Sequence, residues 1–261
     1  EIGEADPLET AVDARPPRRA DRLTHLLFAS VGGALDHAGL DPRAHAPDRI
    51  GLFVGTGQLP DGPAASFWRC ALERGFDRAS GPAFARMVLN APAGAVGRSL
   101  ELRGPLTVVA DGEGAGLSAA VLAFDWLRRR DDADVLIVAS AFEVGRIVRD
   151  GPTSSGTHEA SAAVVFARSS WAEAAGVAPR LRVVDASLTG AGPRTSRDRP
   201  RHDAADLVAL VDACHRADRD RVVAHSSSFG DVGTRATLSL APHAPLPLTT
   251  SRPHAKATLH G

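Results

Sequence analysis

Cysteine is scarce in this sequence, with Cys70 and Cys214 as its two examples among 261 residues. They lie far apart, in segments with helical patterning. Such a pair forms neither the framework of a small disulfide-linked protein nor a metal site, so we expect no bound metal. Two half-buried thiols are typical of a reducing compartment, and we expect a cytoplasmic protein.

An excess of charge of one sign and long apolar runs are also missing. Thirty basic residues offset 31 acidic ones, which gives a formal net charge of −1. This balance gives no electrostatic reason to expect nucleic acid or an acidic membrane surface as a partner. No apolar run approaches the roughly 20 residues of a membrane-spanning helix, and the N-terminus has no signal-peptide pattern. We therefore expect neither nucleic acid nor a membrane as a partner.

Short apolar segments alternate with segments whose apolar residues recur at helical spacing. Uniformly apolar runs such as Val135–Ala139 are typical of strands covered by helices on both faces. The alternation predicts an α/β protein. The expected strands cover residues 50–55, 106–110, 135–139, 160–167, 181–186 and 221–224, and the expected helices cover 23–38, 117–130 and about 203–217, with a further helix-sized segment after residue 228.

Three blocks of sequence stand out between residue 20 and the end of the chain. The blocks are Asp21–Asp41 with IGLFVGTG at 50–57, then LNAPAG at 89–94 with LRGPLTV at 102–108 and GEGAGL at 112–117, then AHSSS at 224–228 with LTTSRP at 248–253. In their order and spacing they resemble the β-ketoacyl synthases, the thiolase-fold condensing enzymes of fatty-acid and polyketide assembly. The second block is similar to the stretch that leads into the nucleophile of that family, and the third to its histidine and lysine/histidine motifs.

The resemblance implies an α/β, thiolase-like layered αβαβα fold that needs no cofactor. We expect an N-terminal arm at residues 1–19, an N-terminal half at 20–170 and a reduced C-terminal half at 171–261. The C-terminal half is shorter than the family pattern implies. Either contacts with a partner cover the gap, or this is a naturally shortened variant.

The nucleophile position departs from the family pattern. A condensing enzyme places a cysteine at a strand-to-helix turn, where the helix N-terminus lowers the pKa of the thiol. By resemblance that position is Glu113, which precedes Gly116–Leu117. A carboxylate is a poor nucleophile toward a thioester. Glu113 is either the occupant of a pseudo-active site or a product of drift, because a helix N-terminus stabilises a carboxylate without any function.

Two histidines of the family support decarboxylation of the extender unit. The first aligns with His225, whereas the second motif aligns its lysine with Arg252 and its histidine with Ala257. The resemblance therefore implies a pseudo-site of Glu113, His225 and Arg252 in which no catalytic set is intact. His225 either binds an acyl thioester or is a hydrogen-bonded core histidine.

The resemblance also implies an interface. A short segment of the second block lines the dimer interface of the family, and an ordinary proline turn is the alternative. The residues concerned are Asn90, Ala91, Pro92 and Gly94. The basic run at 128–130 either meets an acidic carrier protein or is a solvated helix end.

Three glycines between a strand and a helix raise a different class of site, a dinucleotide-binding loop. Gly112, Gly114 and Gly116 have the spacing GxGxG rather than GxGxxG, and Glu113 would repel a phosphate. This motif is weak.

The resemblance thus favours a non-catalytic subunit similar to a chain-length factor. Its expected partners are an active ketosynthase, in a heterodimer, and an acyl carrier protein. The alternatives are a cysteine-less decarboxylase of malonyl-carrier protein, which would use Glu113 and His225, and a homodimeric scaffold without catalysis.

Overall fold

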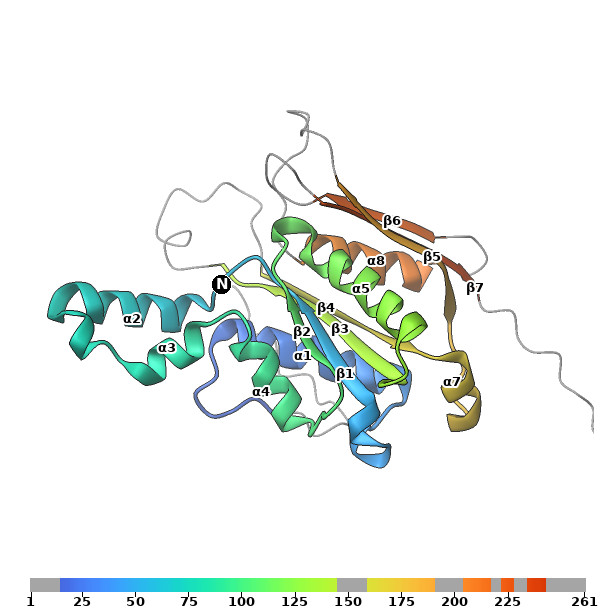
Figure 1. Cartoon of the computed structure of the whole chain (residues 1–261), viewed down its shortest axis with the longest axis horizontal. Helices are drawn as coiled ribbons and strands as arrows, with labels where there is room; N and C mark the ends of the chain where they lie inside the picture. The colour runs from blue at the N-terminus through green and yellow to red at the C-terminus, as the bar shows by residue number, and fades with distance from the viewer. Residues whose placement is uncertain (1–14, 145–158, 191–203, 217–221, 228–233, 243–261) are drawn as a thin grey trace, which may run out of the picture.

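The computed structural model describes residues 15–144, 159–190, 204–216, 222–227 and 234–242. These residues form four layers in the order helix, sheet, helix, sheet (Figure 1). The α/β class and the layered arrangement are confirmed. None of the described helices is long and apolar enough to cross a membrane.

The first sheet has the order β2-β1-β3-β4. Strand β1 pairs in parallel with both neighbours, and β3 pairs antiparallel with β4. All six residues of β1 are buried, as are the first seven of β3, because helices cover both faces. The strands are β1 (Ile50–Gly55), β2 (Leu106–Val109), β3 (Val135–Phe142) and β4 (Ala160–Ala167).

Helices α1 (Arg22–Ala38) and α4 (Ala91–Ser99) cover one face of this sheet. Alternate strand residues such as Leu52 and Ile137 pack there, since successive side chains of a strand point to opposite faces. Helix α1 is capped by the carboxylate of Asp21, which accepts the Thr24 N–H at 2.9 Å.

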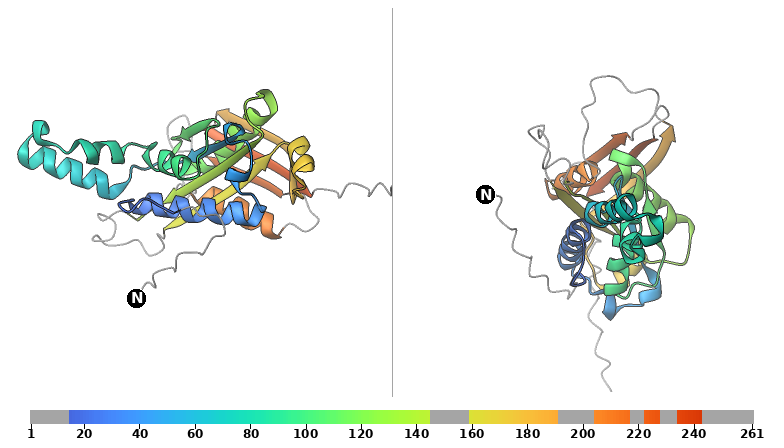
Figure 2. Two further views of the ribbon diagram at one scale, coloured as in Figure 1. Left: turned by 90° about the horizontal axis from the view of Figure 1, so that it is seen from below. Right: turned by 90° about the vertical axis from the view of Figure 1, so that its left-hand side faces the viewer.

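Helices α5 (Ala115–Arg129) and α8 (Ala205–Arg216) lie between the first sheet and the second (Figures 1 and 2). The second sheet is antiparallel, with the order β5-β7-β6. Its strands are β5 (Leu181–Gly190), β6 (Val222–Ser227) and β7 (Thr234–Pro242), and α7 (Ser169–Ala175) links the two sheets. The predicted boundary near residue 170 falls within α7 and remains a prediction.

One expected element is wrong. Strand β7 occupies part of the segment after residue 228 that was expected to be helical. Ala236, Leu238 and Leu240 are buried against the central helices. Their spacing of two residues is the strand period, which outweighs the helix-compatible length of the segment. The apolar turn at 245–248 lies outside the described residues.

A helical hairpin stands away from the layers (Figure 2). It consists of α2 (Asp61–Arg74), a 3₁₀ turn η3 (Phe76–Arg78) and α3 (Gly81–Met87). The base of the hairpin is tied to the end of β3. Glu143 is buried, and its carboxylate accepts the Asp61 N–H, at the start of α2, at 2.6 Å. Gln58 and the backbone of Glu143 exchange two further hydrogen bonds, at 3.2 and 3.3 Å.

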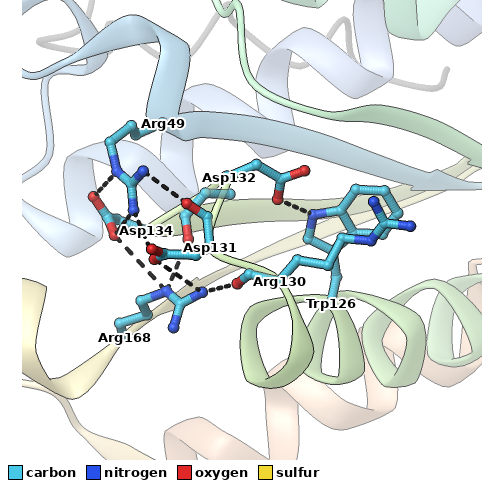
Figure 3. A network of polar contacts seen from close by, with 8 residues as sticks. Arg49, Trp126, Arg130, Asp131, Asp132, Asp134 and Arg168 are labelled. Carbon is cyan, nitrogen blue, oxygen red and sulfur yellow. Dashed lines mark hydrogen bonds and ion pairs between the residues drawn. The ribbon is translucent and has the colours of Figure 1, made fainter.

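The opposite end of the first sheet is held by an ion network (Figure 3). The guanidinium of Arg49, just before β1, donates to both carboxylate oxygens of Asp134 and to the Asp131 carbonyl. Arg168, just after β4, pairs with Asp134 at 3.7 Å. Three chain segments therefore meet at one carboxylate. The hydrogen bond from Arg49 holds the pKa of Asp134 below its usual value.

Replacing Asp134 with Asn should lower the Tm by a few degrees at neutral pH, because the two guanidinium groups lose their common anion. An acid with a lowered pKa contributes stability above its unfolded pKa of about 4, and this contribution disappears as the pH falls through the folded pKa. Thermal unfolding between pH 3 and 7 tests this. If the Tm of Asp134→Asn depended on pH in the same way as the Tm of the wild type, the prediction would be contradicted.

The pKa of Glu143 shifts in the opposite direction to that of Asp134. Burial raises the pKa of Glu143, because the ionised carboxylate is the less favourable form there. Glu143→Gln keeps an acceptor for the Asp61 N–H and should equal or exceed the wild type in stability at pH 8. Glu143→Ala removes the acceptor and should destabilise by about 2 kcal/mol. Denaturant unfolding at pH 5 and 8 measures both. Equal losses in the two variants would show that the charge itself is required.

Candidate functional site

The carboxyl ends of β1, β2 and β3 meet at the first turn of α5. A Cβ atom on Gly55, the last residue of β1, would lie 2.1 Å from the Ala115 carbonyl oxygen. The Ser140 hydroxyl, from β3, donates to the Gly55 carbonyl at 2.8 Å. Two strand ends and the helix start are therefore packed at a distance that only glycine allows.

Helix α8 approaches the same turn from the other side. A Cβ atom on Gly116 would lie 2.9 Å from the Cβ of Leu207 and 3.0 Å from Oδ1 of Asp206. This glycine is thus explained by helix packing. Since a carboxylate also lies at the start of α5, the structure does not favour a phosphate there, and the dinucleotide-binding alternative loses its support.

Asp206 is the residue that sequence reasoning missed. It is 8% exposed, and its Oδ2 accepts the Leu117 N–H of α5 at 2.8 Å. Its Oδ1 accepts the N–H of Leu207 at 2.8 Å. One carboxylate therefore serves the N-termini of two helices, where a negative charge is stabilised. The signal in the sequence was an acid in the first turn of the helix, next to the apolar run Leu207–Val211.

The turn that carries Glu113 has the expected strand-turn-helix form. Strand β2 ends at Val109, the 3₁₀ turn η4 (Gly112–Gly114) follows, and α5 begins at once. Gly112 has a φ of 59°, in the left-handed region. Asp111, before the turn, accepts a hydrogen bond of 2.6 Å from the Ser118 hydroxyl. Glu113 is the middle residue of η4.

The structure brings two of the three predicted pseudo-site positions to the same region. The turn η4 contacts β6, the strand of the second sheet that contains His225. In this strand His225 pairs with Thr237 of β7. Arg252 lies outside the described residues. The roles of Glu113, His225 and Arg252 remain predictions.

The predicted interface segment forms the start of α4. Asn90 is exposed, and its carbonyl accepts the Gly94 N–H at 2.9 Å. Pro92 is buried, whereas Ala91 and Gly94 are half-buried. Pro92 therefore packs largely inside the chain, and a role at an interface remains a prediction for all four residues.

The basic run at 128–130 is largely engaged within its own helix. Arg129 and Arg128 pair with Asp125 at 2.6 and 3.6 Å. The guanidinium of Arg130 lies 4.3 Å from the centre of the Trp126 ring (Figure 3). These contacts favour a solvated helix end over a carrier-protein site.

Asp206→Ala should destabilise the fold by about 2 kcal/mol, because two buried N–H groups lose their acceptor. Asp206→Asn retains an acceptor and should cost less. Urea unfolding of both variants measures the difference. The nearby exposed acid Asp212 is the matched control, and Asp212→Ala should have a smaller effect than Asp206→Ala. A loss for Asp206→Ala no larger than for Asp212→Ala would contradict the assigned role.

Comparison with solved structures gives the same fold. One match is a complex of a type II polyketide synthase acyl-carrier protein with its ketosynthase bound to the hexaketide (AntDE:AntF). It has a TM-score of 0.72 and 13% identity over 86% of this chain and 84% of that chain. A β-ketoacyl synthase from Burkholderia phymatum has a TM-score of 0.74 and 12% identity over 93% and 87%. The ishigamide ketosynthase/chain length factor has a TM-score of 0.66 and 20% identity over 87% and 83%.

These likenesses confirm the thiolase-like layered fold. No curated protein sequence matches the chain. The family model of the beta-ketoacyl synthase N-terminal domain matches residues 1–145, more than half of the 261 residues. The chain therefore belongs to the β-ketoacyl synthase family.

Proposed function

We propose that this chain is a non-catalytic subunit, similar to a chain-length factor, that pairs with an active β-ketoacyl synthase. The pathway would be polyketide biosynthesis, including polyenes, or fatty-acid-type biosynthesis. The observation that carries the proposal is a complete strand-turn-helix around Glu113, the residue that by resemblance replaces the nucleophile. In the pair, the cysteine of the partner carries the acyl group, and this chain helps to shape the tunnel for it.

Asp206 adds an electrostatic argument. A helix N-terminus activates a thiol because its unpaired N–H groups favour the thiolate. At the start of α5 one of these groups, the Leu117 N–H, already donates to a buried carboxylate. This N–H group is therefore not available to stabilise a thiolate. This environment suits a structural turn better than a nucleophile.

The solved relatives support the kind of partner. One of them holds an acyl-carrier protein with its ketosynthase, and another is a ketosynthase/chain length factor. By analogy we propose an active ketosynthase as the heterodimer partner of this chain and an acyl carrier protein as the donor to the pair.

A second candidate has one observation in its favour. The turn η4, which contains Glu113, contacts β6, the strand of His225, and these two residues would form the decarboxylating pair on malonyl-carrier protein. Carbon dioxide release by the purified chain, lost in His225→Ala, would establish this activity. No release above the background without protein would exclude it.

Co-expression and co-purification with an active ketosynthase from the same organism test the main proposal. We expect a 1:1 complex by mass determination, with acyl label on the partner and none on this chain. Label on this chain would refute the non-catalytic role, and a chain that ignores the ketosynthase would refute the pairing.

Glu113→Cys sharpens the test. Because Asp206 disfavours a thiolate at the start of α5, this variant should also take up no acyl group from acyl-carrier protein. Intact-mass measurement detects the adduct, with the partner ketosynthase as the positive control. Rapid acylation of Glu113→Cys would show that the glutamate alone had silenced the site.

A further inference from the structure

A pocket lies at the base of the hairpin, where α2 leaves the layers (Figure 2). We name it the clasp pocket, because the hydrogen bond between Glu143 and Asp61 that clasps the hairpin lies at its wall. Its volume is about 330 Å³, at the small end of the range of about 300–1,000 Å³ for ligand pockets. Six of the ten residues that line it are charged, namely Arg19, Asp21, Arg22, Asp61, Arg86 and Glu143. A lining of this kind suits a small charged molecule rather than an acyl chain.

The acids are the less exposed of these charged residues. Glu143 is 5% exposed, and Asp21 and Asp61 are half-buried. Oε1 of Glu143 accepts the Asp61 N–H at 2.6 Å, whereas Oε2 of Glu143 has no hydrogen-bond donor within the described residues. A buried carboxylate oxygen without a donor is unfavourable, so the pocket offers an unused acceptor to a ligand that can donate.

The clasp itself does not require a charge at this position. An amide oxygen would also accept the Asp61 N–H, without the cost of burying an ionised group. Burial raises the pKa of Glu143, the hydrogen bond from the Asp61 N–H opposes this, and the carboxylates of Asp21, Asp61 and Glu159 raise the pKa further. The surroundings of Oε2 are therefore negative, which favours a bound cation. A buried acid of this kind beside a pocket is typical of a binding site.

The arginines of the clasp pocket are more exposed than its acids. Nη2 of Arg22 lies 2.8 Å from Oε2 of Glu159, so its charge is already paired. The guanidinium of Arg86 donates to the backbone carbonyls of Pro82 and Arg19, at 3.2 and 3.5 Å. Neither Arg86 nor Arg19 forms an ion pair with a carboxylate in the part of the chain that the structure describes. Their two charges are therefore available to an anionic group of a ligand.

We propose that the clasp pocket binds a small zwitterion with one ammonium and one carboxylate group, in the manner of a free amino acid. The ammonium group donates to Oε2 of Glu143, and the carboxylate meets Arg86 and Arg19 at the more exposed side. The arginines repel a simple cation and the acids repel a simple anion, so the two patches together favour a molecule with both charges. This site goes beyond the proposed function and does not depend on a ketosynthase partner.

Isothermal titration calorimetry of the full chain tests the proposal with glycine, β-alanine and 4-aminobutyrate, which separate the two charges by increasing lengths. At least one of them should bind about tenfold or more tightly than the amine and the carboxylic acid of the same chain length, each of which carries one of the two charges. If none of the three binds, or if the amine alone binds as well as the zwitterion, the proposal fails.

Two substitutions separate the two contacts. Glu143→Gln keeps an acceptor for the Asp61 N–H but removes the anion, and should weaken zwitterion binding about tenfold or more. Arg86→Gln should also weaken zwitterion binding, without weakening binding of the amine. The matched control is Arg74→Gln in the last turn of α2, outside the pocket, which should bind as the wild type does. Thermal unfolding confirms that each variant is folded. Unchanged binding in both pocket variants would refute the assigned contacts.

The pH dependence of binding is a readout that a merely structural role of Glu143 would not give. The ammonium group pairs with the ionised carboxylate, so affinity should rise with pH through the raised pKa of Glu143. The charges of the zwitterion itself do not change between pH 5 and pH 8, which makes titration at these two values the measurement. Equal affinity of the wild type at both values, or the same pH dependence in Glu143→Gln, would overturn the proposal.

Discussion

The close approach of β1 to the start of α5 is the constraint on which the rest of the structure depends. Gly55 allows the strand end to touch the Ala115 carbonyl, and Gly116 allows α8 to lie against the same turn. Since α5 packs on the first sheet on one side and on the second sheet on the other, this turn sets the spacing of the layers. A side chain at either glycine would push a layer away, at a cost that no local adjustment of backbone relieves.

Under the proposed function, this constraint explains how a chain keeps the form of a catalytic turn without the nucleophile. Gly55 and Gly116 are needed for packing whether or not a reaction occurs, so replacement of a cysteine at the turn would leave the fold intact. Asp206 meets the electrostatic demand of this turn, because its carboxylate accepts the buried Leu117 N–H at the start of α5. The turn therefore has a structural role at the contact of the first sheet with the central helices, apart from any chemistry.

The sequence predicted the elements whose pattern is local. The buried parallel strands expected at 50–55 and 135–139 are continuous apolar runs, and the structure has strands there. Strand β7 was missed because a polar stretch surrounds its alternating residues. Asp206 and Glu143 were missed for another reason, since their partners lie 89 and 82 residues away along the chain.

The hairpin and the pseudo-active turn share their supports. The hairpin follows the end of β1 and is clasped by Glu143 at the end of β3, whereas the turn is packed against Gly55 of β1 and connected to β3 through Ser140. Any substitution that shifts these strand ends moves both features together. Under the proposed function, a turn without chemistry would still leave the strand ends fixed in place, because the hairpin is attached to them. A subunit that carries out no reaction at the turn would keep the architecture of a condensing enzyme for this reason, even with its reacting side chains replaced.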